Sequence, residues 1–175
     1  MQLLGAKGNE EFMELAWQEA GKARCADSQF GAVIVKDGLD IARGRNEPVG
    51  EECEQCIRAD KSGGVNAELC FAVHAEQNAL IDALHNHADV RGAVMYIGGY
   101  KKGEKRVFKG KPFCTVCSRL IAASGIKGVV LYAEGGYAFL ESGEFNEASF
   151  NTMLERHGLK MARKAVKASS TPRNL

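Results

Sequence analysis

A histidine, a carboxylate and two cysteines have residue types and spacings that suit metal chemistry. His74 and Glu76 stand two residues apart, just before an apolar stretch with helical periodicity. Cys114 and Cys117 form a Cys-x-x-Cys pair that begins 40 residues after the histidine, and their spacing places both thiols on one face of a first helical turn. His74, Cys114 and Cys117 therefore offer three ligands of the kinds that zinc prefers.

Three protein ligands, instead of four, are typical of a catalytic zinc site because the fourth position stays open. Two thiolates and a neutral imidazole leave the Zn²⁺ unit near zero net charge, so a water in the open position can lose a proton near neutral pH if a base lies beside it. Glu76 is placed to be that base and is the predicted catalytic residue. In the alternative interpretation, Glu76 is a fourth ligand and the zinc site is purely structural.

The motif His-Ala-Glu at residues 74–76, followed by Pro-Phe-Cys-Thr-Val-Cys at residues 112–117, resembles the zinc-dependent cytidine and deoxycytidylate deaminase superfamily. The resemblance implies an α/β fold with three layers, α/β/α, in which helices flank a mixed five-stranded sheet. It also implies hydrolytic deamination with Zn²⁺ as cofactor and Glu76 as proton shuttle. The pattern is closest to deoxycytidylate deaminases, so conversion of dCMP to dUMP is the expected reaction.

The resemblance covers about residues 10–132 and includes one difference in the metal motif. Residues 30–38 resemble the first hairpin of deoxycytidylate deaminases, and Cys25 resembles a cysteine that those enzymes often carry. In the family the proline usually precedes the first cysteine directly, whereas Phe113 intervenes here. We therefore expect the turn that enters the second metal-bearing helix to differ from the family's usual turn.

The segment Gly-Arg-Asn-Glu-Pro at residues 44–48 is the predicted substrate-binding loop. Deoxycytidylate deaminases usually have Gly-Tyr-Asn-Gly here, and their asparagine is associated with the nucleotide sugar. Asn46 matches this pattern and is the predicted substrate contact, while Arg45 and Glu47 differ from it. The alternative is that Asn46 is a turn residue that hydrogen-bonds to its own backbone.

Four further cysteines could hold a second metal ion. Cys25, Cys53, Cys56 and Cys70 supply enough thiols for a closed tetrahedral zinc site, and deoxycytidylate deaminases often carry a second zinc nearby. The alternative is that these cysteines are free and buried, where they behave as small apolar groups.

Residues 101–111 contain six basic side chains and one acidic side chain next to the metal-bearing cysteines. Such a run is usually a solvated loop, but its position makes a phosphate contact credible. The basic segment is also compatible with the alternative that the protein is a deaminase that edits RNA such as tRNA. Two further alternatives are a deaminase of another amino-heterocycle and a zinc-binding module without catalysis.

Periodicity, turn residues and capping residues predict an alternation of helices and strands. In chain order these are a helix over 9–24 with Asn9 as its N-cap, strands at 31–35 and 39–45 joined by an Asp37-Gly38 type I′ turn, a helix over 75–85, a strand at 93–98, a helix over 114–124 ended by Gly125, a strand at 129–132, a helix over 147–157 and a fifth strand at 159–163.

Length and composition indicate an ordinary globular protein. The 175 residues, with 45% apolar residues, 26% charged residues and a net charge of +1, fit one zinc-dependent deaminase domain over 1–165 and a disordered polar tail over 166–175. No run approaches the roughly 20 apolar residues of a membrane helix, and we expect a cytoplasmic protein with no membrane partner. The expected partner is a small nucleotide or nucleoside ahead of nucleic acid, and we expect a homo-oligomer of undetermined size.

Overall fold

The computed structural model of the chain describes residues 2–4, 8–50, 70–101, 106–107, 114–133 and 136–159. Its helices are α1 (Asn9–Gly21), α2 (Ala75–His85), α3 (Thr115–Ala123) and α4 (Ser142–Arg156), and its strands are β1 (Gln2–Leu4), β2 (Ser28–Lys36), β3 (Leu39–Arg45), β4 (Glu47–Pro48), β5 (Ala72–Val73), β6 (Val94–Lys101), β7 (Arg106–Val107), β8 (Gly128–Ala133) and β9 (Gly136–Glu141). None of the helices in these ranges is long and apolar enough to cross a membrane. The tail predicted over 166–175 lies outside the described residues, and the single domain over 1–165 stays a prediction.

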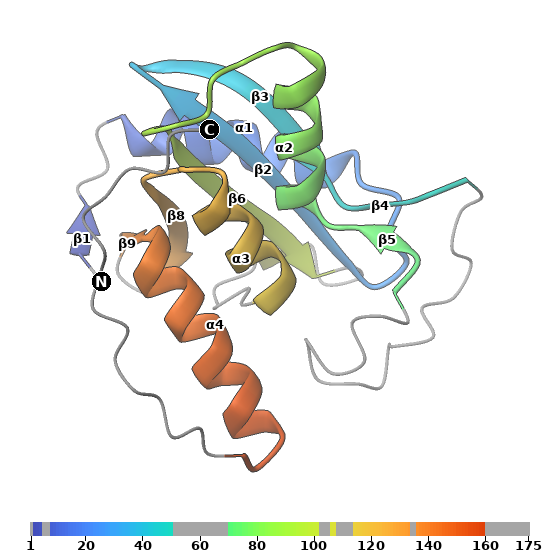
Figure 1. Ribbon diagram of the computed structural model, residues 1–175. Helices are drawn as coiled ribbons and strands as arrows, with labels where there is room; N and C mark the ends of the chain where they lie inside the picture. The colour runs from blue at the N-terminus through green and yellow to red at the C-terminus, as the bar shows by residue number, and fades with distance from the viewer. Residues whose placement is uncertain are drawn as a thin grey trace.

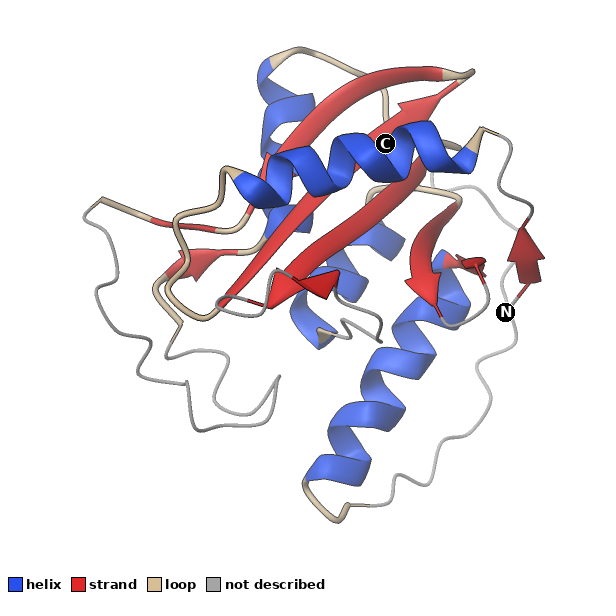
Figure 2. Ribbon diagram, turned by 180° about the vertical axis from the view of Figure 1, so that it is seen from behind, coloured by secondary structure: helices blue, strands red, loops and turns tan. Residues whose placement is uncertain are grey.

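Three layers build the fold, as predicted. The main sheet has the order β1-β9-β8-β6-β2-β3, with β7 beside β6, and its five longer strands form the expected mixed sheet. Strands β6 and β8 are parallel, whereas β2 is antiparallel to both of its neighbours and β9 is antiparallel to β8. Helix α1 covers one face of the sheet, and α2, α3 and α4 cover the other (Figure 1; Figure 2).

Alternating side chains of the central strands supply a core to each face of the sheet. In β2, Ala32 and Ile34 pack toward α2 and α3, while Val33 packs toward α1. All three side chains are buried, which confirms the prediction of a strand covered on both faces. The following turn is also confirmed, because Asp37 and Gly38 both have positive φ, 51° and 79°, as a type I′ turn requires.

The start of α1 differs from the prediction. Gly8, with a φ of 83°, is the N-cap, and Asn9 is the first helical residue. The side chain of Asn9 instead accepts a hydrogen bond of 2.9 Å from the hydroxyl of Tyr96 on β6. A polar residue that was expected to cap its own helix therefore joins the helix to the sheet.

The fifth long strand lies earlier in the chain than predicted. It is β9, which turns back on β8 as an antiparallel hairpin and places Tyr137 toward α1 and Leu140 toward α4. Leu159, the first residue of the predicted fifth strand, follows the end of α4 and is in no strand, and residues 160–163 lie outside the described residues. Helix α4 accordingly begins at Ser142, before its predicted start at residue 147.

Helix α2 lies against the edge strand β3 at a glycine. A Cβ at residue 44 would overlap the backbone of Ala75 and Ala79 in α2, so only glycine allows this approach. On either side of Gly44, α2 side chains bond to the strand's main chain. The Arg43 amide donates to Asp82 Oδ2 at 2.9 Å, and Asn78 Nδ2 donates to the carbonyl of Arg45 at 2.7 Å. These contacts cover an otherwise exposed strand edge and fix the position of the first turns of α2.

Replacement of Gly44 by alanine is expected to destabilise the protein by about 1–3 kcal/mol, because α2 must move away from β3 to make room for the methyl group. The position of Glu76 should be disturbed as well, since it lies in the same part of α2. Gly143→Ala is the matched control, because a Cβ there meets no atom within 4 Å and the residue lies in a helix. Denaturant unfolding at constant zinc concentration checks both variants, and equal stability of the two would contradict this account of α2.

Candidate active site

His74 stands at the N-terminus of α2, where two contacts fix its backbone. It is the N-cap residue, with extended φ and ψ of −71° and 157°. Its amide donates to Oε1 of Gln77 at 2.9 Å, and its carbonyl accepts from the amide of Asn78 at 2.9 Å. The preceding strand β5 is also held, because Val73 pairs with Glu47 in the two-stranded sheet of β4 and β5.

Cys114 and Cys117 stand at the N-terminus of α3, as the sequence predicts. Cys114 is the N-cap residue, and Cys117 is the third residue of the helix and is buried. The neighbouring Ser118 anchors this turn to α4, because its hydroxyl donates to Oδ1 of Asn146 at 3.0 Å. The positive ends of α2 and α3 thus carry the ligand candidates, and a helix N-terminus favours the thiolate form of a cysteine.

The fold brings His74, Cys114 and Cys117 together. One ligand atom from each lies within 4.8 Å of the other two, and Cys117 Sγ is 3.3 Å from His74 Nδ1. Zinc binds nitrogen and sulfur at about 2.0–2.3 Å, so ligand atoms around a tetrahedral ion stand about 3.5–3.8 Å apart. Small side-chain rotations would bring the three atoms to that spacing, and their chemistry fits zinc.

Hydrogen bonds among the three ligand candidates shift the pKa of each. A hydrogen bond with Cys114, followed by one with Cys70, raises the pKa of His74 to about 11. The hydrogen bond with Cys117, aided by His74, lowers the pKa of Cys114 to about 4. Cys117 has a raised pKa because it donates to Cys114 and is buried. The cluster thus pairs an imidazolium with a thiolate, and a metal ion would displace protons from His74 and Cys117.

Glu76 is the second residue of α2, and its side chain is only 5% exposed. Burial is the largest influence on its pKa, which is raised, while the nearby His74 acts in the opposite direction. Cys117 lies within hydrogen-bond reach of this carboxylate and acts to lower its pKa. Glu76 does not belong to the group of ligand atoms within 4.8 Å of one another, which favours a position beside the ion over the alternative of a fourth ligand.

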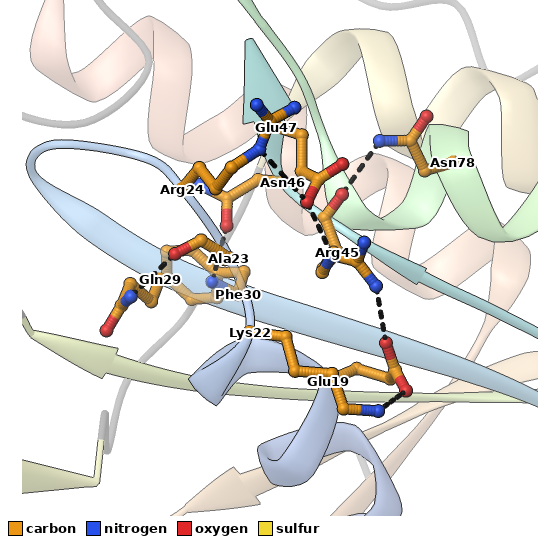
Figure 3. A network of polar contacts seen from close by, with 10 residues as sticks. All are labelled: Glu19, Lys22, Ala23, Arg24, Gln29, Phe30, Arg45, Asn46, Glu47 and Asn78. Carbon is orange, nitrogen blue, oxygen red and sulfur yellow. Dashed lines mark hydrogen bonds and ion pairs between the residues drawn. The ribbon is translucent and has the colours of Figure 1, made fainter. Parts of the chain in front are cut away.

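Asn46 is buried at the end of β3, and its side chain bonds to β2. Its Oδ1 accepts from the amide of Phe30 and its Nδ2 donates to the carbonyl of Ser28, each at 2.7 Å (Figure 3). The alternative of a turn residue bonded to its own backbone is therefore wrong. An asparagine amide can make four hydrogen bonds, so these two leave capacity for a substrate hydroxyl, and the sugar contact stays a prediction.

Charged residues on both sides of Asn46 form a network that the sequence did not reveal. Arg45 Nε donates to Glu47 Oε1 at 2.5 Å, and Arg45 also reaches Glu19 on α1 at 3.3 Å (Figure 3). Glu47 lies 3.6 Å from Nε of Arg24, and Glu19 lies 2.6 Å from Lys22. The sequence shows Arg45 and Glu47 only as differences from the family pattern, because their partners Glu19 and Arg24 are more than 20 residues away.

The predicted second zinc site is only partly within the described residues. Cys70 hydrogen-bonds to His74 and so lies next to the first site, while Cys25 is half-buried after α1. Cys53 and Cys56 lie outside the described residues. A second zinc on these four cysteines therefore stays a prediction.

Comparisons with known proteins agree with this site. The family described as the cytidine and deoxycytidylate deaminase zinc-binding region matches residues 6–133. A deoxycytidylate deaminase of Mycobacterium phage D29 is 36% identical over 133 residues, which is 70% of this chain and 91% of that enzyme. The deoxycytidylate deaminase of Schizosaccharomyces pombe is 31% identical, over 69% of this chain and 35% of that longer enzyme.

A solved structure shows the same fold. The dCMP deaminase of cyanophage S-TIM5, in complex with dCMP and dUMP, matches with a TM-score of 0.54 and 25% identity, over 73% of this chain and 82% of that one. The family match spans most of the chain and includes every residue of the His/Cys/Cys group. This chain is therefore a deaminase and belongs to the zinc-binding family of cytidine and deoxycytidylate deaminases.

Proposed function

We propose that this chain catalyses the zinc-dependent hydrolytic deamination of a cytosine nucleotide, with dCMP converted to dUMP. His74, Cys114 and Cys117 hold the zinc, and Glu76 moves the protons. The observation that carries the proposal is the buried carboxylate of Glu76 beside the His/Cys/Cys group at the heads of α2 and α3. The phage relative that this chain nearly spans, a deoxycytidylate deaminase, supports the choice of nucleotide.

Deamination replaces the amino group on C4 of cytosine with an oxygen from water and releases ammonia. When bound, zinc would supply a Lewis acid that makes a water molecule a better nucleophile. Glu76 takes a proton from the water and delivers it to N3 of the ring as the C–O bond forms. The same carboxylate then takes the hydroxyl proton and delivers it to the departing amine, so both protons of the water are accounted for.

The environment of Glu76 suits this shuttle. Burial raises its pKa, and a carboxylate with a raised pKa is a stronger base than an exposed one. Its place in the first turn of α2, which is pinned to β3 by Asn78 and Asp82, holds the carboxylate still relative to the zinc ligands. Asn46, at the end of the same strand, is the proposed contact to the nucleotide sugar.

Glu76→Gln is expected to retain zinc and fold but to lose turnover by roughly 10²–10⁴-fold, because an amide keeps the shape of the side chain and cannot accept the proton of water. The rate of dCMP loss, followed by ultraviolet absorbance, checks the activity, and metal analysis checks the zinc. Glu11→Gln removes an exposed carboxylate from the first turn of α1 and should leave the rate unchanged. More than a tenth of wild-type activity in Glu76→Gln would assign the proton shuttle to another residue.

Cys114→Ala or Cys117→Ala is expected to release the catalytic zinc, because two remaining ligands hold the ion too weakly. Cys53→Ala should at most lower thermal stability through the proposed second site. Zinc measured per chain separates the two sites, with two ions expected in the wild type. One ion per chain, unchanged in Cys53→Ala, would eliminate the second site and leave the first intact.

The nucleotide dCMP is expected to be a better substrate than deoxycytidine by about tenfold or more, because charge-assisted contacts to phosphate strengthen binding. The sequence-based candidate for this contact is the basic segment 101–111, most of which lies outside the described residues. The test compares kcat/KM on both substrates, at low and high salt, in the wild type and in Lys105→Ala/Arg106→Ala. Ammonia released from RNA and not from mononucleotides would instead favour an RNA-editing deaminase.

A further inference from the structure

A network of three cations and two carboxylates lies beside the substrate-binding loop. The carboxylates of Glu19 and Glu47 are the deeper partners, with side chains 8% and 22% exposed. The cations above them are more open, since Lys22 is 57%, Arg24 41% and Arg45 37% exposed. The positive and negative side chains alternate (Figure 3), and three positive charges against two negative charges leave the network with an excess of one positive charge.

The two arginines differ in how firmly they are held. Arg45 is clamped by Glu47 through Nε and by Glu19 through a terminal nitrogen. The hydrogen bond with Glu47 is the largest cause that raises the pKa of Arg45, so its charge is permanent. Arg24 has only a 3.6 Å ion pair with the same Oε1 of Glu47, too long for a hydrogen bond. Within the described part of the chain, the N–H groups of Arg24 therefore stay available to another acceptor.

The main chain of this network contacts α2 and the strand before it, while the side chain of Arg45 pairs with Glu19 on α1. Glu47 pairs with Val73, the residue directly before His74. The carbonyl of Arg45 accepts from Asn78, which lies two residues after Glu76. Asn46, the proposed sugar contact, stands between Arg45 and Glu47 in the chain. A nucleotide with its base at Glu76 and its sugar at Asn46 would bring its phosphate to this end of β3, where Arg45 and Glu47 flank Asn46 in the chain.

We propose that Arg24 and Arg45 form the subsite for the phosphate group of the nucleotide substrate, with Glu47 and Glu19 as the residues that position Arg45. The inference rests on the proposed function, because it assigns the part of the same site that tells a nucleotide from a nucleoside. A guanidinium group can bind a phosphate through two parallel hydrogen bonds. Two guanidinium groups together can balance the double negative charge of the phosphate. Before the substrate arrives, both arginines pair with Glu47, and Arg24 turns to the phosphate on binding.

Arg24→Gln is the decisive variant, because Arg24 is the more loosely held arginine and its loss leaves the clamp on Arg45 in place. The ratio of kcat/KM for dCMP to kcat/KM for deoxycytidine should fall about tenfold or more, and affinity for the product dUMP, measured by calorimetry, should fall by a similar factor. Arg45→Lys keeps the positive charge but loses the planar set of guanidinium donors. It should lower the same ratio of kcat/KM values while the protein stays folded. Arg43→Gln is the matched control, since Arg43 is on the same strand, equally exposed and paired with Asp40.

An unchanged ratio of kcat/KM for dCMP to kcat/KM for deoxycytidine in Arg24→Gln would overturn the subsite. A ratio that falls only in Lys105→Ala/Arg106→Ala would also overturn it, because that result would place the phosphate at segment 101–111. An equal fall on both substrates would also overturn it and make Arg24 a structural residue. Failure of the proposed function looks different. If the wild type deaminates neither substrate but binds dUMP more tightly than deoxyuridine, and Arg24→Gln removes that difference, the anion subsite stands and the assigned reaction does not.

Discussion

Helix α2 lies directly on strand β3 because residue 44 has no side chain, and the active site depends on that approach. The backbone of Gly44 touches the first turn of α2, and Asn78 and Asp82 lock the helix to the strand on both sides. A shift of α2 would move His74 and Glu76 together and would separate them from Cys114 and Cys117, which α3 and α4 hold independently. The distance between two separately anchored helix ends therefore decides whether three ligand atoms can share one ion.

The convergence of these helix ends also sets the electrostatics. Two N-termini favour negative charge, and the cluster contains two thiols and a buried carboxylate that would otherwise resist ionisation in a dry environment. Without a metal, His74 takes a proton and Cys114 gives one up, so the charges balance within the cluster. A divalent cation would balance the thiolate charges in place of the protonated His74 and would bind the ligands more strongly. Zinc binding is therefore coupled to the local fold.

Sequence reasoning succeeded where a local pattern has one physical interpretation. The His-Ala-Glu and Cys-x-x-Cys spacings predicted the grouping of ligands, and Asp37-Gly38 predicted the turn, because each depends on neighbours within a few residues. It was wrong at Asn9, which bonds to Tyr96 on β6 and does not cap its helix. That choice between two hydrogen-bond partners is made by the tertiary fold and leaves no local signal.

The same reasoning explains why β9 was missed. Its alternation, with Tyr137 on one face and Leu140 on the other, extends over only six residues and runs directly into α4, so no long apolar run marks it. The five-stranded sheet was predicted from the alternation of strands and helices and from the family resemblance, but the place of its last strand depends on whether the chain folds back after β8 or crosses over. Register and turn geometry decide that question, and neither is visible in composition.

Arg45 and Glu47 show how a difference from a family pattern becomes interpretable once the fold is known. Taken singly, each residue only weakened the assignment of the substrate loop. In three dimensions they form one unit with Glu19 and Arg24, and the asparagine between them points its amide into β2. Because the partly exposed carboxylate of Glu47 lies beside both arginines and reduces their repulsion, the chain can hold two guanidinium groups close together. In the phosphate subsite proposed above, the same arrangement leaves directed donors for an anionic group of the substrate.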